Sequence, residues 1–240
     1  MNKVLVYRIG SIGDTLVALP AFWAIRKALP SARITYLTNG ETENPDDLIA
    51  RRILPEGIFD EWTAYPSGNL IKTAPRLIRH LRRQNFDALF YLMPRTRSAF
   101  RVRRDLLFFR AAGMKRIYGA KHFAANLLPL RPDRPAAAVE READFLLDCL
   151  YSENLNWPAR ENLTADLGLK DAEIRKAREW LKANCEIPWR ENRLLAVMTG
   201  SNWSSKIWPE ANYARVVSRL VKEKNVFPIV FGGKNERAQG

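Results

Sequence analysis

The sequence predicts an α/β protein built on parallel β-strands, and three observations carry that prediction. The apolar run at 3–7 (KVLVY) is typical of a buried strand, and a helical pattern at 15–29 and a second strand at 33–37 follow it. A similar strand–helix–strand order returns at 194–231. Because a helix joins the two strands of each unit, we expect them to be parallel with a right-handed crossover. With 240 residues, 47% of them hydrophobic, the chain can bury one large core or two modest ones.

The first part of the chain supplies further elements of one domain. Residues 40–57 are expected to form a loop with at most one helical turn. The apolar runs DALFYL and RIYG predict strands at 87–92 and 116–119, and helices are expected near 74–85 and 139–151. The sequence therefore predicts a Rossmann-like parallel sheet within residues 1–170.

A second, smaller domain is expected after a proline-containing crossing at 155–169. The predicted elements are a helix at 171–184 capped by Asp171, a strand at 194–198, a loop at 199–208, a helix from Pro209 to about Lys224, and a strand at 226–231. Two strands and one helix are too few to cover both faces of a sheet. Residues 171–240 are therefore interpreted as a linker helix and an incomplete second domain.

Composition limits the partners and the compartment. The formal net charge of +13 favours polyanions, namely nucleic acid, anionic lipid or phosphorylated sugars. Cys149 and Cys185 have no metal-ligand spacing and suit a reducing cytosol. The start of the chain lacks the pattern of a signal peptide, since Arg8 interrupts its short apolar stretch, and the longest apolar run (16–25) is about half a membrane span. We expect a soluble protein, or at most one that visits a membrane surface.

The first strand passes into its helix through RIGSIGD (8–14), which ends on Asp14. Glycines at 10 and 13 suit a tight turn, because glycine adopts positive φ without steric cost. Asp14 is either a helix cap or a functional carboxylate, and both interpretations stay open. The turn lies at the carboxyl end of the strand, where open parallel sheets bind ligands. It does not match the dinucleotide fingerprint, which disfavours a nicotinamide-dependent oxidoreductase.

The loop after the strand at 194–198 reads TGSNWSSKIWPE. Gly200, Ser201 and Asn202 offer backbone and side-chain donors, and Lys206 adds a positive charge, so the loop could cradle a diphosphate. The alternative is a solvated loop whose lysine points to water, which is the commoner situation for a loop lysine.

Arginines are concentrated between Lys72 and Arg116, where thirteen Lys or Arg residues accompany two acidic ones. Single arginines there suit a solvated helix face or an exposed loop, whereas the cluster suggests binding of phosphate or carboxylate. Arg95, Arg97 and Arg101 directly follow a predicted strand and are expected to face the ligand cleft. A nucleic-acid-binding protein is disfavoured, because no recognition motif occurs and aromatic residues are not interleaved with the arginines.

Together the two loops give the sequence a family resemblance. VLVYRIGSIGDTLVALPAFWAIRKALPSARITYLT, followed by TGSNWSSKIWPEANYARVVSRL and VFPIVFGGKNE, resembles glycosyltransferase family 9, the ADP-heptose:lipopolysaccharide heptosyltransferases of Gram-negative bacteria. The resemblance implies the GT-B architecture: an N-terminal Rossmann-like domain that receives the acceptor and a second that holds the nucleotide sugar. Members of the family normally continue well beyond GGKNE, so we expect residues 1–240 alone to transfer little sugar.

The resemblance also implies roles for individual residues. Asp14 matches the catalytic base, and Glu236 matches an acidic residue that contacts the donor nucleoside. The residues expected to hold the donor diphosphate are Gly200, Ser201, Asn202 and Lys206, and those expected to contact the acceptor are Gly13, Arg95, Arg97 and Arg101.

The implied reaction is inverting transfer of heptose from ADP-heptose to an inner-core lipopolysaccharide or lipid A acceptor, without a cofactor. No D-x-D triplet occurs, so we expect no metal at the site. The implied location is cytoplasmic, with peripheral contact at the anionic inner membrane. A transferase of the same architecture that uses another nucleoside diphosphate sugar remains the alternative.

Overall fold

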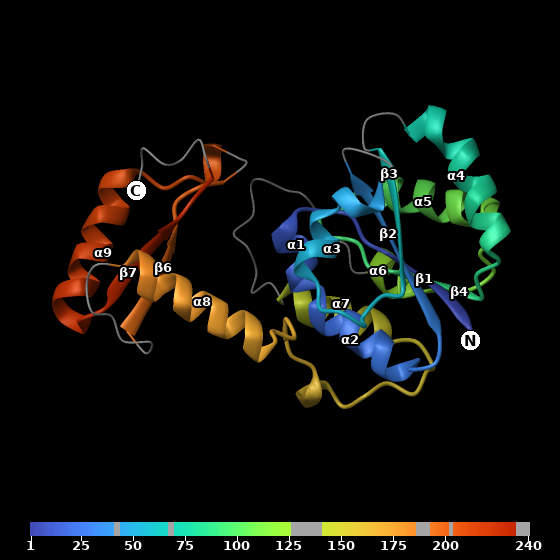
Figure 1. Cartoon of the computed structure of the whole chain (residues 1–240). Helices are drawn as coiled ribbons and strands as arrows, with labels where there is room; N and C mark the ends of the chain where they lie inside the picture. Colours follow the sequence, from blue (N-terminus) through green and yellow to red (C-terminus); the bar gives the residue numbers. More distant parts are fainter. Residues whose placement is uncertain (41–43, 67–69, 126–140, 186–192, 202–203, 234–240) are drawn as a thin grey trace. The chain divides into compact units, whose positions relative to one another are not determined.

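The chain folds into two compact units, Met1–Leu169 and Lys170–Gly240, in the computed structural model shown in Figure 1. The structure describes residues 1–40, 44–66, 70–125, 141–185, 193–201 and 204–233. The division falls one residue from the boundary that the sequence suggested.

The first unit is built on a five-stranded sheet in the order β3-β2-β1-β4-β5, in which every neighbouring pair is parallel. Its strands are β1 Lys3–Tyr7, β2 Arg33–Gly40, β3 Glu61–Pro66, β4 Ala88–Tyr91 and β5 Ile117–Tyr118. This is the strand order of a Rossmann-like half, and it confirms the predicted α/β class with a parallel sheet.

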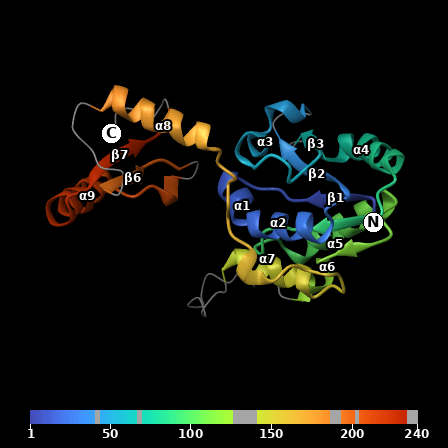
Figure 2. The same cartoon turned by 60° about the horizontal axis from the view of Figure 1, so that its bottom comes forward.

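Helices connect these strands or follow the last of them. They are α1 Ile12–Val17, α2 Leu19–Ala28, α3 Ile49–Ile53, α4 Leu70–Gln84, α5 Ala99–Ala111, α6 Ala120–Ala125 and α7 Glu142–Tyr151, with short 3₁₀ segments at Pro45–Asp47 and Arg160–Asn162. Helices α6 and α7 pack against each other, as Figure 2 shows, and α2 packs against α7. None of the helices within the described ranges is long and apolar enough to span a bilayer.

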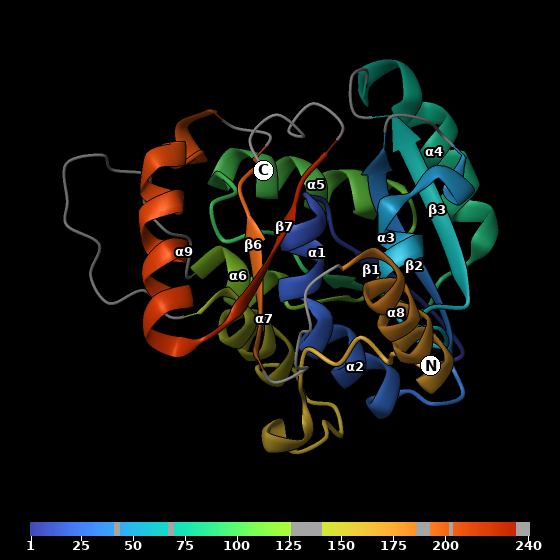
Figure 3. The ribbon, with the colours of Figure 1, turned by 60° about the vertical axis from the view of Figure 1, so that its left-hand side comes forward.

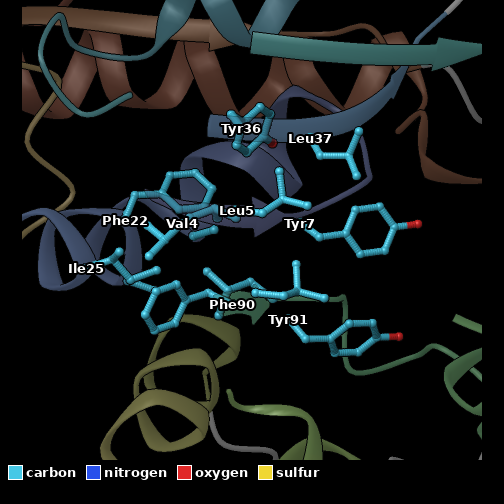
Figure 4. Close-up of a cluster of buried hydrophobic side chains, with 14 of the residues drawn as sticks. Val4, Leu5, Tyr7, Phe22, Ile25, Tyr36, Leu37, Phe90 and Tyr91 are labelled. Carbon is cyan, nitrogen blue, oxygen red and sulfur yellow. The ribbon is translucent and has the colours of Figure 1, made fainter. Parts of the chain in front are cut away.

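Helices cover both faces of the sheet. Tyr36 and Leu37 are successive residues of β2, so their side chains point to opposite faces. Tyr36 makes an edge-on ring contact with Phe22 of α2, with centroids 5.6 Å apart. Tyr7 pairs with Leu37 in the sheet and shares its face, and its ring lies 4.8 Å from that of Phe109 in α5. Strands β1 and β4 are therefore buried on both sides, and Figure 4 shows their side chains within this core.

The second unit contains α8 Asp171–Asn184, β6 Leu194–Met198, a 3₁₀ segment at Ser204–Lys206, α9 Glu210–Lys224 and β7 Phe227–Phe231. Strands β6 and β7 form a parallel pair, and α9, which joins them, packs against β7 (Figure 3). The predicted second strand–helix–strand unit is thus present.

Several local predictions were wrong. The helix predicted at 15–29 begins at Ile12 and is two helices, α1 and α2, that meet at Ala18. The 40–57 region has more helix than one turn, and β3, α5 and α6 were not predicted. Helix α8 is not capped by Asp171: Lys170 holds the N-cap position, and its backbone N–H donates to the Glu173 carboxylate at 2.8 Å.

Candidate functional site

The turn between β1 and α1 holds the Asp14 carboxylate by a reciprocal cap. Ser11 is the N-cap residue, and Asp14 is the third residue of the helix. The Ser11 backbone N–H and hydroxyl donate to Asp14 Oδ2 at 2.7 and 2.8 Å, and the Asp14 N–H donates back to Ser11 Oγ at 3.5 Å. This is a capping box, in which Ser11 rather than Asp14 holds the N-cap position and the Asp14 carboxylate takes part in the cap. Both donors engage Oδ2, and Asp14 is only half-buried, so its carboxylate can also meet a ligand.

Gly10 is required by the position of Asp14. Its φ is +144°, and a Cβ built on it would lie 2.5 Å from Asp14 Cβ and 2.7 Å from Oδ2. Any larger residue would therefore push the carboxylate away. Gly13 differs, because it lies inside α1 without a positive φ, and a Cβ there would meet nothing nearer than Ser11 Oγ at 3.8 Å. Only the first of the two glycines fits the expectation of positive φ.

Arg8 is fully buried and stabilises the turn through hydrogen bonds to backbone carbonyls. Its Nε and Nη2 donate to the Asp14 carbonyl at 3.1 and 2.7 Å, and its Nη1 donates to the Leu92 carbonyl at 3.1 Å. Burial lowers the pKa of Arg8, and the Glu142 carboxylate, 3.7 Å from Nη1, acts in the opposite direction. Arg8 was not predicted as a site residue. A single arginine at the end of an apolar strand was the signal that could have found it.

Arg95 is joined to the Asp14 turn through Glu142. Its backbone N–H donates to Glu142 Oε1 at 3.1 Å, the same oxygen that faces Arg8. Its guanidinium lies over the ring of Phe145 in α7, 4.6 Å from the centroid. Glu142 therefore ties the loop after β4 to the turn after β1.

Arg97 and Arg101 lie in different surroundings. Arg97 is buried, and its Nε and Nη2 donate to Asp105 Oδ2 at 2.6 and 2.5 Å. Burial alone would lower the pKa of Arg97, but the Asp105 carboxylate raises it. Arg101 is exposed in the first turn of α5, where its N–H donates to the capping Ser98 hydroxyl. Of these two arginines, only Arg101 presents its side chain to solvent.

The predicted diphosphate loop belongs to the second unit. Gly200 is exposed and Ser201 is half-buried just after β6, and Lys206 is exposed at the end of the 3₁₀ segment. Asn202 and Glu236 lie outside the described residues. Within the described ranges, no three His, Cys, Asp or Glu side chains gather in a way that could hold a metal ion.

The parallel sheet and its strand order define a Rossmann-like α/β protein. The family model for glycosyltransferase family 9 (heptosyltransferase) matches residues 74–239. The chain belongs to this family. The match begins after the Asp14 turn, so it covers the arginine-rich region and the second unit.

Two solved structures resemble the chain. One is a glycosyl transferase of family 9 from Veillonella parvula DSM 2008, 17% identical, with a TM-score of 0.57, covering 99% of this chain and 64% of that one. The other is E. coli heptosyltransferase WaaC with ADP-2-deoxy-2-fluoro heptose, 16% identical, with a TM-score of 0.52, covering 99% of this chain and 71% of that one. These likenesses confirm the fold. A comparison with curated proteins finds no match.

Proposed function

We propose that this chain provides the acceptor half and part of the donor half of an inverting, metal-independent glycosyltransferase. The reaction moves a heptose from ADP-heptose to an inner-core lipopolysaccharide or lipid A acceptor. Family membership supports sugar transfer. The choice of donor is supported by the ADP-heptose analogue in the similar E. coli structure. The choice of a phosphorylated, membrane-held acceptor is supported by the net charge of +13.

The geometry of Asp14 is the single observation that carries the proposal. Ser11 occupies Oδ2, which leaves Oδ1 to take the proton of an acceptor hydroxyl. As the acceptor oxygen bonds to the anomeric carbon, the bond from that carbon to the donor phosphate breaks, and ADP leaves with the electron pair. Attack opposite the leaving group inverts the anomeric centre. A positioned general base of this kind contributes about 10²–10⁴-fold in rate.

The remaining roles follow the chemistry of each side chain. Gly200, Ser201, Asn202 and Lys206 would hold the diphosphate and offset its charge as it leaves, and Glu236 would contact the nucleoside. Gly13 and the arginines Arg95 and Arg101 would contact the acceptor. Because Arg97 already pairs with Asp105, its part in the proposal is to hold the shape of the loop after β4.

The same proposal includes a location. Heptose transfer to a lipid-linked acceptor would take place in the cytoplasm, with peripheral contact at the anionic face of the inner membrane. The excess of positive charge supports such a contact, since each cationic residue near an anionic bilayer gains about 1 kcal/mol.

The test is the Asp14→Asn variant of the natural gene product, compared with Asp46→Asn. Asp46 is an exposed carboxylate of the same unit and pairs with Arg51. We expect Asp14→Asn to lose about 10²–10⁴-fold in kcat, with ADP-heptose binding unchanged, because only the base is removed. Asp46→Asn should transfer normally.

Wild-type transfer by Asp14→Asn would refute the assignment of the base. A protein that is inactive with ADP-heptose but active with GDP- or UDP-sugars would instead favour the alternative donor while keeping the same base.

A further inference from the structure

A cavity of about 340 Å³ lies in the first unit, between the sheet and helices α4 and α5. Tyr7 at the end of β1 and Tyr65 in β3 line it from the sheet. Ala74 and Leu77 of α4 and Phe108 of α5 supply apolar walls. Its volume is at the small end of the range for small-molecule sites, and the carboxyl ends of parallel strands are where such sites occur. The cavity is therefore built like a ligand site for one narrow apolar group.

A cluster of charged side chains lies on one side of the cavity, where Arg104 and Asp105 line it. Arg104 lines it and is 44% exposed, so its guanidinium lies between the cavity and solvent. Asp105 pairs with Arg104 at 3.0 Å and with Arg97 at 2.5 Å, and it also accepts the Tyr91 hydroxyl at 3.0 Å. One carboxylate thus faces two guanidinium groups, and the partly exposed Arg104 can pair with a further anion.

The sheet side of the cavity offers one polar donor. The hydroxyls of Tyr7 and Tyr65 are 2.8 Å apart and share one hydrogen bond. Two hydroxyls that share one bond keep one O–H for another acceptor. The interior otherwise presents aliphatic and aromatic carbon, which favours an occupant with few polar atoms.

The outer face of α5 continues the apolar surface into solvent. Phe100 is 77% exposed and Leu107 is 64% exposed. Residues 100, 104 and 107 recur at helical spacing, so these two side chains lie on the same face as Arg104. A large apolar side chain on each side of a cation is the arrangement that suits an amphiphile with a negative headgroup.

We propose that this cavity binds the hydrocarbon chain of a single-chain anionic amphiphile, whose headgroup pairs with Arg104. The residues that line the cavity all belong to the first unit, and the binding proposed here needs neither the nucleotide sugar nor the transfer reaction. The proposal therefore stands or falls independently of the proposed function.

The experiment is calorimetric titration of the intact protein with octyl, decyl and dodecyl sulfate below their micelle-forming concentrations. Inorganic sulfate and decyl maltoside serve as the headgroup and chain controls. Affinity should rise about fourfold for each added methylene, because each one leaves water for the cavity. Decyl sulfate should bind more tightly than decyl maltoside, and inorganic sulfate should bind weakly.

Two pairs of variants locate the binding. Arg104→Gln should weaken decyl sulfate about tenfold, whereas Arg103→Gln, which removes the same charge from an exposed neighbour, should not. Ala74→Leu should block the cavity, whereas Ala111→Leu adds the same bulk at an exposed position of α5. Far-UV circular dichroism checks that each variant is folded.

Affinity that does not depend on chain length would overturn the proposal, and so would equal weakening by Arg104→Gln and Arg103→Gln. If Ala74→Leu fails to fold, the arginine pair and the chain-length series still decide the matter. Unchanged binding in a folded Ala74→Leu variant would place the amphiphile elsewhere.

Discussion

The two units begin with similar strands but bury them to different extents. In the first unit, β1 (KVLVY) is buried from Val4 to Tyr7. In the second, β6 (LLAVM) has one buried residue, Val197, and its last residue, Met198, is 72% exposed. Among the described residues of the second unit, only Val197 and Thr199 are buried.

The difference shows that an apolar strand does not by itself make a core. In the first unit, helices on both faces of five parallel strands cover β4 and the part of β1 from Val4 to Tyr7. In the second unit, two strands and α9 leave Val230 and Phe231 of β7 about half exposed. A parallel sheet needs a layer of helices on each face before its strands are shielded from water.

The largest expected effect comes from separating the units between Leu169 and Lys170. The fragment 1–169 contains every member of the main buried cluster and should unfold cooperatively on heating. The fragment 170–240, at about 70 residues, is near the size at which one small core rarely suffices, and it should show no cooperative transition. Circular dichroism during a thermal scan measures both. A sharp transition in fragment 170–240 would contradict the comparison.

The next test compares two phenylalanines of the two sheets. Phe90 is fully buried in β4 and stacks on Tyr118, with centroids 5.3 Å apart, whereas Phe231 at the end of β7 is 49% exposed. Phe90→Ala should lower the free energy of unfolding by about 3–5 kcal/mol, because it removes a core ring and leaves a cavity. Phe231→Ala should cost much less.

Native-state hydrogen exchange of the β1 and β7 amides reports each effect in its own unit. If Phe231→Ala lowered the free energy of unfolding as much as Phe90→Ala does, the second unit would have a packed core. The contrast in burial between the two units would then be wrong.

The sequence predicted strands well where they contain a continuous apolar run, as β1, β4, β6 and β7 do. It missed β3, because Glu61 and Pro66 bound a short edge strand whose burial depends on its neighbours. It missed α5, because five arginines between 95 and 105 obscured the apolar positions Val102 and Phe109, which are buried. Local pattern does not record which element will cover a residue.

In the candidate site, too, some features follow from local sequence and others depend on the tertiary fold. Asp14 follows from a short motif, and the local geometry of Gly10 and Ser11 lies within the same few residues. Arg8 belongs to the same motif, but its partners Leu92 and Glu142 lie far along the chain and meet it only after the sheet is assembled. The motif therefore indicates where Arg8 lies, whereas its contacts depend on the tertiary fold.

Ion pairs give a further comparison between the units. Asp105 and Arg97 are 4% and 7% exposed, whereas Arg219 and Glu223 of α9 are 75% and 50% exposed. Asp105→Asn should cost about 3–5 kcal/mol, because it leaves a buried guanidinium without its carboxylate. Glu223→Gln removes an exposed i,i+4 pair and should cost no more than about 0.5 kcal/mol. The midpoint of urea unfolding measures the first change, and hydrogen exchange of α9 measures the second. Equal losses of stability in Asp105→Asn and Glu223→Gln would mean that the ion pairs of the two units do not differ in strength as their burial indicates.

The smallest predicted change in stability is a loss of stability of the first unit at alkaline pH. Burial raises the pKa of Tyr36 to about 12 and also raises the pKa values of Tyr7, Tyr65 and Tyr91. In the unfolded chain tyrosine titrates near 10, so the folded state holds its protons longer. The tyrosine contribution to stability is therefore complete below pH 10 and is lost as the pH rises from 10 toward 12.

For Tyr36 alone the loss should approach about 2–3 kcal/mol, from two pKa units at 1.36 kcal/mol each. The second unit contains one tyrosine, Tyr213, whereas the first contains five whose pKa values are raised, namely Tyr7, Tyr36, Tyr65, Tyr91 and Tyr151, so the alkaline loss should appear mainly in the first unit. Urea unfolding at a series of pH values measures the slope. Tyr36→Phe is the control: it cannot ionise, so its stability should fall less steeply above pH 10 than that of the wild type, even though it starts lower without its hydroxyl contacts to Thr15 and Thr38. If the free energy of unfolding of Tyr36→Phe fell with pH as steeply as that of the wild type, Tyr36 would not be held neutral by the core. The core of the first sheet would then be less shielded from water than the exposed fractions of its side chains indicate.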